Sequence, residues 1–118
     1  MSGRRLCRIE EIDEDGGKGF VFGEGTARRE IFLVRVGDKV FGYENACPHL
    51  GSPLEFNPDR FLNAEGTHII CATHGALFEI ADGYCVSGPC AGDSLTPIAL
   101  ELEDDGWVTW PDAPGDLR

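Results

Sequence analysis

Two short segments carry the residues best suited to chemistry, a Cys-x-His at Cys47 and His49 and a Cys-x-x-His at Cys71 and His74. Each segment supplies one thiolate and one imidazole. With five cysteines and three histidines in 118 residues, the two spacings rarely arise together by chance. These donors suit zinc, copper or an iron–sulfur centre, whereas calcium and magnesium prefer oxygen ligands. The sequence therefore predicts a metal site built from these four residues.

The order of the donors bears on which metal they hold. Zinc fingers usually pair Cys with Cys and His with His, whereas each segment here carries one of each. That alternation suits two irons bridged by sulfides, with each loop giving its Cys to one iron and its His to the other. A structural zinc site is still open as an alternative at this point.

The elements that must position these loops are predicted to be short strands. The apolar runs are rich in Val, Ile, Phe, Tyr and Trp and are separated by Gly, Pro, Asp and Asn, which is typical of an all-β fold. Runs 31–36 and 39–43 flank Gly37 and Asp38, a two-residue hairpin turn. This hairpin leads directly into the first Cys-x-His loop.

Three further segments are predicted to be strands. Runs 95–102 and 107–110 flank a turn and predict a second hairpin, in which Pro97 indicates an edge strand or a bulge. Residues 67–70 predict a short strand that leads to the second ligand loop.

Length and charge limit the classes of protein and partner. A chain of 118 residues predicts one domain, 1–118, and its net charge of −11 disfavours nucleic acid and anionic membranes as partners. A partner with a basic patch is favoured. We expect a cytoplasmic protein, because the sequence shows no signal peptide and no membrane span, and five cysteines then indicate ligands and free thiols.

Beyond the ligands themselves, the sequence resembles the Rieske [2Fe–2S] family. The resemblance covers most of the chain and includes segments 47–54 and 71–78 and the pair Gly88-Pro89, which resembles the family's third, proline-bearing loop over the cluster. The gap of 21 residues from Leu50 to Ile70 is slightly long for the family. We place the extra residues between Asn57 and Gly66.

The resemblance implies a fold, a cofactor and roles for the ligands. The fold would be a Rieske-type antiparallel β sandwich or barrel with a small inserted cluster-binding subdomain at about 46–91. One [2Fe–2S] cluster per chain would be held with Cys47 and Cys71 on the inner iron and His49 and His74 on the outer iron, their ring edges near solvent.

The resemblance also implies a low redox potential. High-potential members place a Ser and a Tyr after the second ligand histidine, where this chain has Ala76 and Phe78. They also carry a disulfide between the ligand loops, at positions occupied here by Ser52 and Thr73. Without those donors, the potential is expected near the low end of the Rieske range.

A Rieske-type ferredoxin is the function that the resemblance implies. Such a protein is an electron carrier without catalytic activity of its own, between an NAD(P)H-dependent flavoprotein reductase and a terminal oxygenase or similar oxidoreductase. Docking is expected near the tip formed by His49 and His74. Two alternatives stay open, the Rieske small subunit of a stable oxidoreductase complex, similar to nitrite reductase, and a zinc-stabilised binding module.

The other cysteines and the third histidine are expected to lie outside the site. His68 begins a short strand and is expected to face solvent. Cys7 is expected to be a core or surface thiol. Cys85 and Cys90 are expected to pack beside the cluster, with a redox pair as the alternative.

Overall fold

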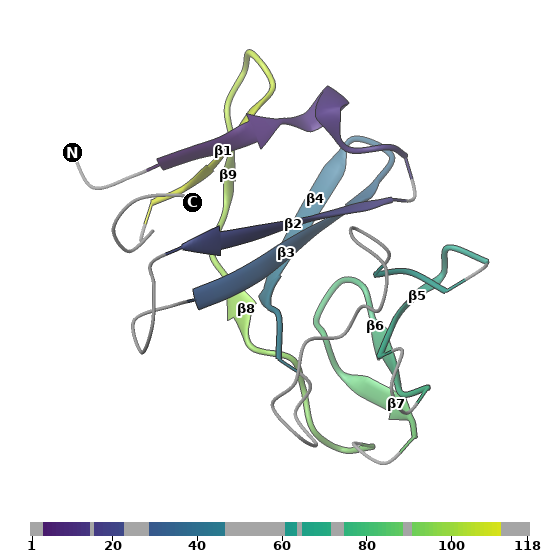
Figure 1. Ribbon diagram of the computed structural model, residues 1–118. Helices are drawn as coiled ribbons and strands as arrows, with labels where there is room; N and C mark the ends of the chain where they lie inside the picture. Colours follow the sequence, from purple (N-terminus) through teal and green to yellow (C-terminus); the bar gives the residue numbers. More distant parts are fainter. Residues whose placement is uncertain are drawn as a thin grey trace.

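The computed structural model describes residues 4–14, 16–22, 29–46, 61–63, 65–71, 75–88 and 91–111. Short strands account for nearly all the regular structure in these ranges, so the prediction of an all-β fold is confirmed (Figure 1). The elements in chain order are β1 (Arg4–Arg8), the 3-10 turn η1 (Ile9–Glu11), β2 (Gly17–Phe22), β3 (Arg29–Val36), β4 (Lys39–Glu44), β5 (His68–Ile70), β6 (Leu77–Glu79), β7 (Cys85–Ser87), β8 (Pro97–Ile98), β9 (Glu101–Leu102) and β10 (Trp107–Trp110).

The described strands form three antiparallel sheets, with orders β1-β10-β9, β2-β3-β4-β8 and β5-β6-β7. The first lies at the top of Figure 1, the second crosses the middle and the third lies at the lower right. The predicted hairpin between β3 and β4 is confirmed, because Val36 pairs with Lys39 and Gly37 has a φ of 62°. The left-handed conformation at Gly37 is one that glycine adopts without strain.

The second predicted hairpin is only partly correct. β9 does pair with β10, but run 95–102 is not one strand, because β8 pairs instead with β4 in another sheet. Gly42 on β4 permits this approach, since a Cβ there would lie 2.8 Å from Ile98 Cγ1. The expectation that Pro97 marks an edge strand is confirmed, because β8 is the last strand of its sheet.

Two apolar cores lie on opposite faces of β3. Ile31 and Leu33 belong to the core shared with β1, β2 and β10, whereas Phe32 and Val34 belong to the core shared with the third sheet. All four side chains are fully buried. Successive side chains of a strand point to opposite faces, so β3 joins the two cores and the second sheet holds the third in place.

The third sheet carries the stems of the predicted second and third loops. Its inward side chains, Ile69, Phe78 and Cys85, alternate with more exposed neighbours and pack into the core with Phe32. The sheet falls inside residues 46–91. The limits of the inserted subdomain and the single-domain organisation stay predictions.

Two buried acidic groups predict a loss of stability in alkali. Burial raises the pKa of the Cys7 thiol to about 11 and that of the Tyr43 phenol to about 12, and the charges of Glu11 and Asp82 add to the respective shifts. The folded protein therefore keeps both protons after the unfolded chain has lost them, at ordinary values of 9.0 and 10.0. The stabilisation is complete below about pH 9 and falls as the pH rises toward about 12, by about 2 kcal/mol per group.

Denaturant unfolding at a series of pH values checks this expectation. The Cys7→Ala chain should show a shallower fall than the wild type between about pH 9 and pH 11. A free energy of unfolding that does not change across this range would contradict it.

Candidate metal centre

Of the four predicted ligands, Cys71 lies in the described part of the chain. It follows β5 directly and is fully buried in the core between the second and third sheets. Its N–H donates to the Ala76 carbonyl oxygen at 2.9 Å, and its carbonyl oxygen accepts from the Gly75 N–H at 2.7 Å. The chain therefore leaves the sheet at Cys71 and returns to it at Ala76, which fixes both ends of the second ligand loop.

The first ligand loop begins where β4 ends. The Asn45 N–H donates to the Glu30 carbonyl oxygen at 2.8 Å, and the Ala46 N–H donates to the Glu44 carbonyl oxygen at 3.0 Å. Asn45 is itself buried. The bond from Asn45 holds the end of β4 next to β3, and the bond from Ala46 is local to the end of β4.

The other three predicted ligands, Cys47, His49 and His74, lie outside the described residues. The described residues hold no group of three or more potential metal-binding side chains. The four-residue ligand set thus stays a prediction.

The end of β7, which leads to the predicted third loop, packs against the end of the second ligand loop. Gly88, directly after β7, has a φ of 103°, and a Cβ there would lie 2.7 Å from Ala76 Cα. The backbones of Gly88 and Ala76 are therefore in close contact beside the second ligand loop. Pro89 lies outside the described residues.

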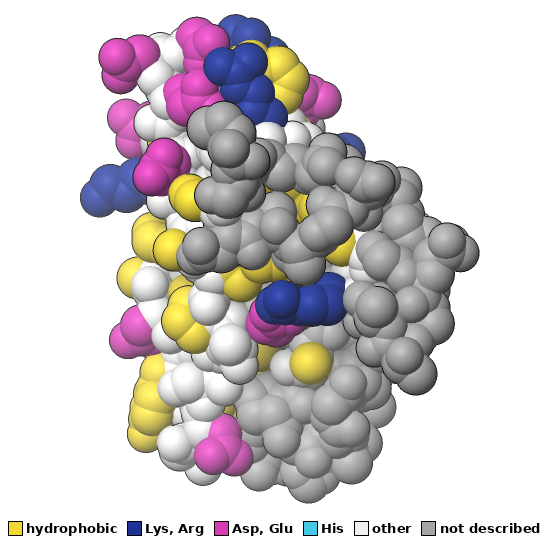
Figure 2. All heavy atoms as spheres, turned by 90° about the vertical axis from the view of Figure 1, so that its left-hand side faces the viewer, with side chains coloured by type: hydrophobic (Ala, Val, Ile, Leu, Met, Phe, Trp, Pro, Cys, Tyr) yellow, Lys and Arg dark blue, Asp and Glu magenta, His cyan; other side chains and the backbone are white. Residues whose placement is uncertain are grey.

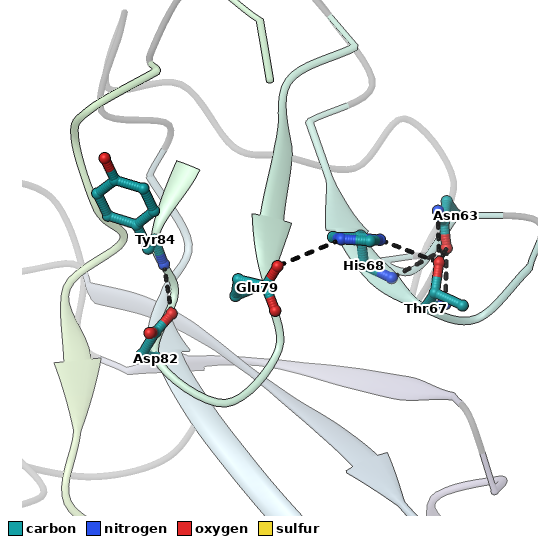
Figure 3. Close-up of polar contacts among 6 residues, drawn as sticks. All are labelled: Asn63, Thr67, His68, Glu79, Asp82 and Tyr84. Atoms are coloured by element: carbon teal, nitrogen blue, oxygen red, sulfur yellow. Dashed lines mark hydrogen bonds and ion pairs between the residues drawn. The ribbon is translucent and has the colours of Figure 1, made fainter. Parts of the chain in front are cut away.

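A polar network supports the start of β5, at the end of the strand remote from Cys71 (Figure 3). Asn63 Oδ1 accepts from the N–H groups of Thr67 and His68 at 2.9 and 3.1 Å. His68 Nε2 lies 3.5 Å from a Glu79 carboxylate oxygen on β6, and Nδ1 lies 3.0 Å from Thr67 Oγ1. Both ring nitrogens thus have partners, and a role in strand pairing accounts for His68 without a metal.

His68 was expected to face solvent, and the structure corrects this in part, since the side chain is 30% exposed and lies against Glu79. The cause is the strand register, which places His68 opposite Glu79. The available sequence signal was a His at the start of one short strand and a Glu at the end of the next, but the register that pairs them is seen only in the folded chain.

The cysteines outside the ligand set are packed in the cores where the structure describes them. Cys85 is buried and free, and its thiol donates to the Ser87 carbonyl oxygen at 3.3 Å. Its packing role is confirmed, while Cys90 lies outside the described residues. Cys7 is a buried free thiol in the other core.

Comparison with known proteins assigns the chain to a family. A family model for the Rieske [2Fe-2S] domain matches residues 4–104. The chain belongs to this family. Its fold is similar to the ferredoxin of Sphingomonas yanoikuyae B1, with 27% identity, a TM-score of 0.66 and coverage of 94% of this chain and 98% of that one.

Two further matches are to chains whose own descriptions name larger assemblies. The solved complex of reduced oxygenase and oxidised ferredoxin in carbazole 1,9a-dioxygenase contains a chain that is 22% identical, with a TM-score of 0.70 and 94% coverage of both chains. The cytochrome bc1 complex Rieske iron-sulfur subunit of Streptomyces lividans is 25% identical over 93% of this chain. This chain spans 65% of the length of that subunit.

The donor set fits the [2Fe–2S] cluster that this family carries, one per chain. Cys71 is fully buried beside Ala76 and Phe78, where an uncompensated thiolate would be unfavourable but a metal-bound one is neutralised. Burial of the thiolate suits any bound metal, and it is the match to the Rieske [2Fe-2S] domain family that confirms the iron–sulfur prediction. Among the described residues, no helix is long and apolar enough to cross a membrane.

The surroundings of Cys71 predict a low redox potential. Ala76 and Phe78 are both fully buried and offer no hydroxyl donor, so neither can stabilise the extra negative charge of the reduced cluster. We expect a midpoint near the low end of the Rieske range, roughly −150 mV. A redox titration that placed it well above about 0 mV would refute this.

Proposed function

We propose that this Rieske protein is a one-electron carrier of the ferredoxin type. It would accept an electron from an NAD(P)H-dependent flavoprotein reductase and pass it to a terminal oxygenase or a similar oxidoreductase. The chain would make and break no covalent bond of a substrate. A cytoplasmic location stays a prediction.

The observation that carries this proposal is the extent of the ferredoxin match. The similarity includes 94% of this chain and 98% of the Sphingomonas ferredoxin, at 27% identity, which supports a ferredoxin role for this Rieske domain. The match to a complex of oxygenase and ferredoxin supports an oxygenase as the acceptor. The match to the Streptomyces bc1 subunit, at 25% identity, covers 65% of that subunit and therefore supports a bc1 role less strongly.

The proposed ligand set assigns a task to each donor residue. Cys47 and Cys71 would hold the inner iron, and His49 and His74 the outer iron. When bound, the cluster supplies one-electron redox chemistry. The buried position of Cys71 keeps its end of the site away from water, so we propose that partners dock at the tip with His49 and His74.

The charge of the surface supports a protein partner with basic groups. The net charge is −11. Arg5 is paired with Glu103 at 2.9 Å, Arg8 with Glu10 at 2.6 Å and Arg29 with Glu44. On the face in Figure 2, basic side chains of the described part lie next to acidic ones instead of forming a patch. Complementary charge on the partner would speed encounter, and added salt would slow it.

Electron paramagnetic resonance of the dithionite-reduced, anaerobically purified protein tests the proposal. We expect the low average g value of a cluster with mixed Cys and His ligands, with iron and labile sulfide equivalent to one cluster per chain. A colourless, silent sample with zinc would overturn it. Co-purification with a larger chain, in a fixed ratio, would favour the stable-complex alternative.

A further inference from the structure

The two ligand loops leave from different sheets. β4 ends at Glu44, three residues before Cys47, and β6 begins at Leu77, three residues after His74. Among the described strands, β4 pairs with β3 and β8, whereas β6 pairs with β5 and β7. No strand pairing among the described strands connects β4 to β6. Other contacts must therefore fix the distance between the two ligand loops.

Tyr43 on β4 makes such a contact. Its hydroxyl donates a 2.6 Å hydrogen bond to the carbonyl oxygen of Ile80, directly after β6. Its ring lies against Gly83, where a Cβ would be 2.8 Å from Tyr43 Cε1 and where φ is 74°. Tyr43 is 1% exposed. The buried side chain of Tyr43, on the second sheet, therefore contacts the turn between β6 and β7 at two residues, Ile80 and Gly83.

The turn that Tyr43 contacts is closely tied to β6 and β7. The Gly83 N–H donates to the Glu79 carbonyl oxygen at 2.8 Å, and the Glu79 N–H donates to the Tyr84 carbonyl oxygen at 2.8 Å. The Tyr84 N–H donates to the Asp82 carboxylate at 2.9 Å (Figure 3). A displacement of this turn would therefore be passed on to both strands.

We propose that Tyr43 is a positioning residue for the cluster, whose hydroxyl bond to Ile80 sets the separation of the two ligand loops. The inference rests on the proposed function and its ligand set. β6 has only three residues, and before it Ala76 accepts the hydrogen bond of the Cys71 N–H. The bond persists at physiological pH, because burial, with the charge of Asp82, raises the pKa of Tyr43 to about 12.

The test compares Tyr43→Phe with Tyr84→Phe. The chain has two tyrosines, and Tyr84 is 46% exposed on the same turn, so the second variant removes the same atom without removing the contact with β4. Both are measured with the cluster bound, by paramagnetic resonance, by redox titration and by the half-life of the visible absorption under an iron chelator. Denaturant unfolding of both is measured as well.

We expect Tyr43→Phe to fold with altered g values or an altered midpoint, and to lose its cluster about three- to tenfold faster than the wild type. Tyr84→Phe should match the wild type in all three measurements. A folded Tyr43→Phe chain that holds no cluster, beside a loaded Tyr84→Phe chain, also supports the inference.

Two outcomes overturn it. Unchanged g values, midpoint and half-life with only a lower unfolding midpoint would show a purely structural role. A Tyr43→Phe chain without a β-type circular dichroism spectrum would show that the bond maintains the whole fold and does not place the loops in particular. Absence of the Rieske signal from the wild type would instead refute the proposed function, and this inference with it.

Discussion

His74→Ala is expected to yield a folded β protein that has lost its cluster entirely. His74 is one of the four proposed ligands, and its removal would leave the outer iron with His49 as its one proposed protein ligand, so cluster assembly should fail. The described members of the core with β1, β2 and β10 all come from segments outside the proposed ligand loops. The far-UV circular dichroism should therefore remain of β type while the visible absorption and the paramagnetic signal disappear.

His68→Ala is the matched control for this experiment. The chain has three histidines, and this variant removes an imidazole from β5, six residues before His74 in the sequence. Its contacts are with Thr67 and Glu79, and a partly exposed pair of this kind contributes at most about 1 kcal/mol. The control should keep the cluster. A Rieske signal in His74→Ala, or its loss in both variants, would contradict the ligand assignment.

The sequence was most informative about features that depend on local chemistry. The spacing of Cys71 and His74 relative to the first pair indicated the family, and Gly37-Asp38 indicated the turn between β3 and β4, because both signals lie within a few residues. Pro97 likewise marked an edge strand. Such features follow from ligand type, glycine conformation and the missing proline N–H.

Contacts between distant segments could not be predicted in the same way. Run 95–102 divides between two sheets because Gly42, far away in sequence, admits Ile98. The bond from Tyr43 to Ile80 depends on how two sheets pack, and no periodicity of either segment encodes it. A buried tyrosine needs a partner for its hydroxyl, but only the fold determines which carbonyl supplies it.

Gly88→Ala is expected to damage the cluster site, whereas Gly92→Ala should be tolerated. Both glycines have left-handed backbones, with φ of 103° and 98°, so an alanine at either position carries a similar strain, roughly 1–3 kcal/mol. Their surroundings differ. A Cβ at Gly88 would lie 2.7 Å from Ala76 Cα and 3.3 Å from Ala76 N, while one at Gly92 meets nothing within 4 Å.

The difference between the two variants isolates the crowding at Ala76. The atoms in the way are mainly backbone, which no rotamer change can move aside, so Gly88→Ala should lose about 1–3 kcal/mol more than Gly92→Ala in denaturant unfolding. Because the Ala76 carbonyl oxygen holds the Cys71 N–H, relief of the clash would displace the second ligand loop. The Gly88→Ala cluster should accordingly decay faster under a chelator, and equal unfolding energies and decay rates would show that the contact between β7 and this loop is loose.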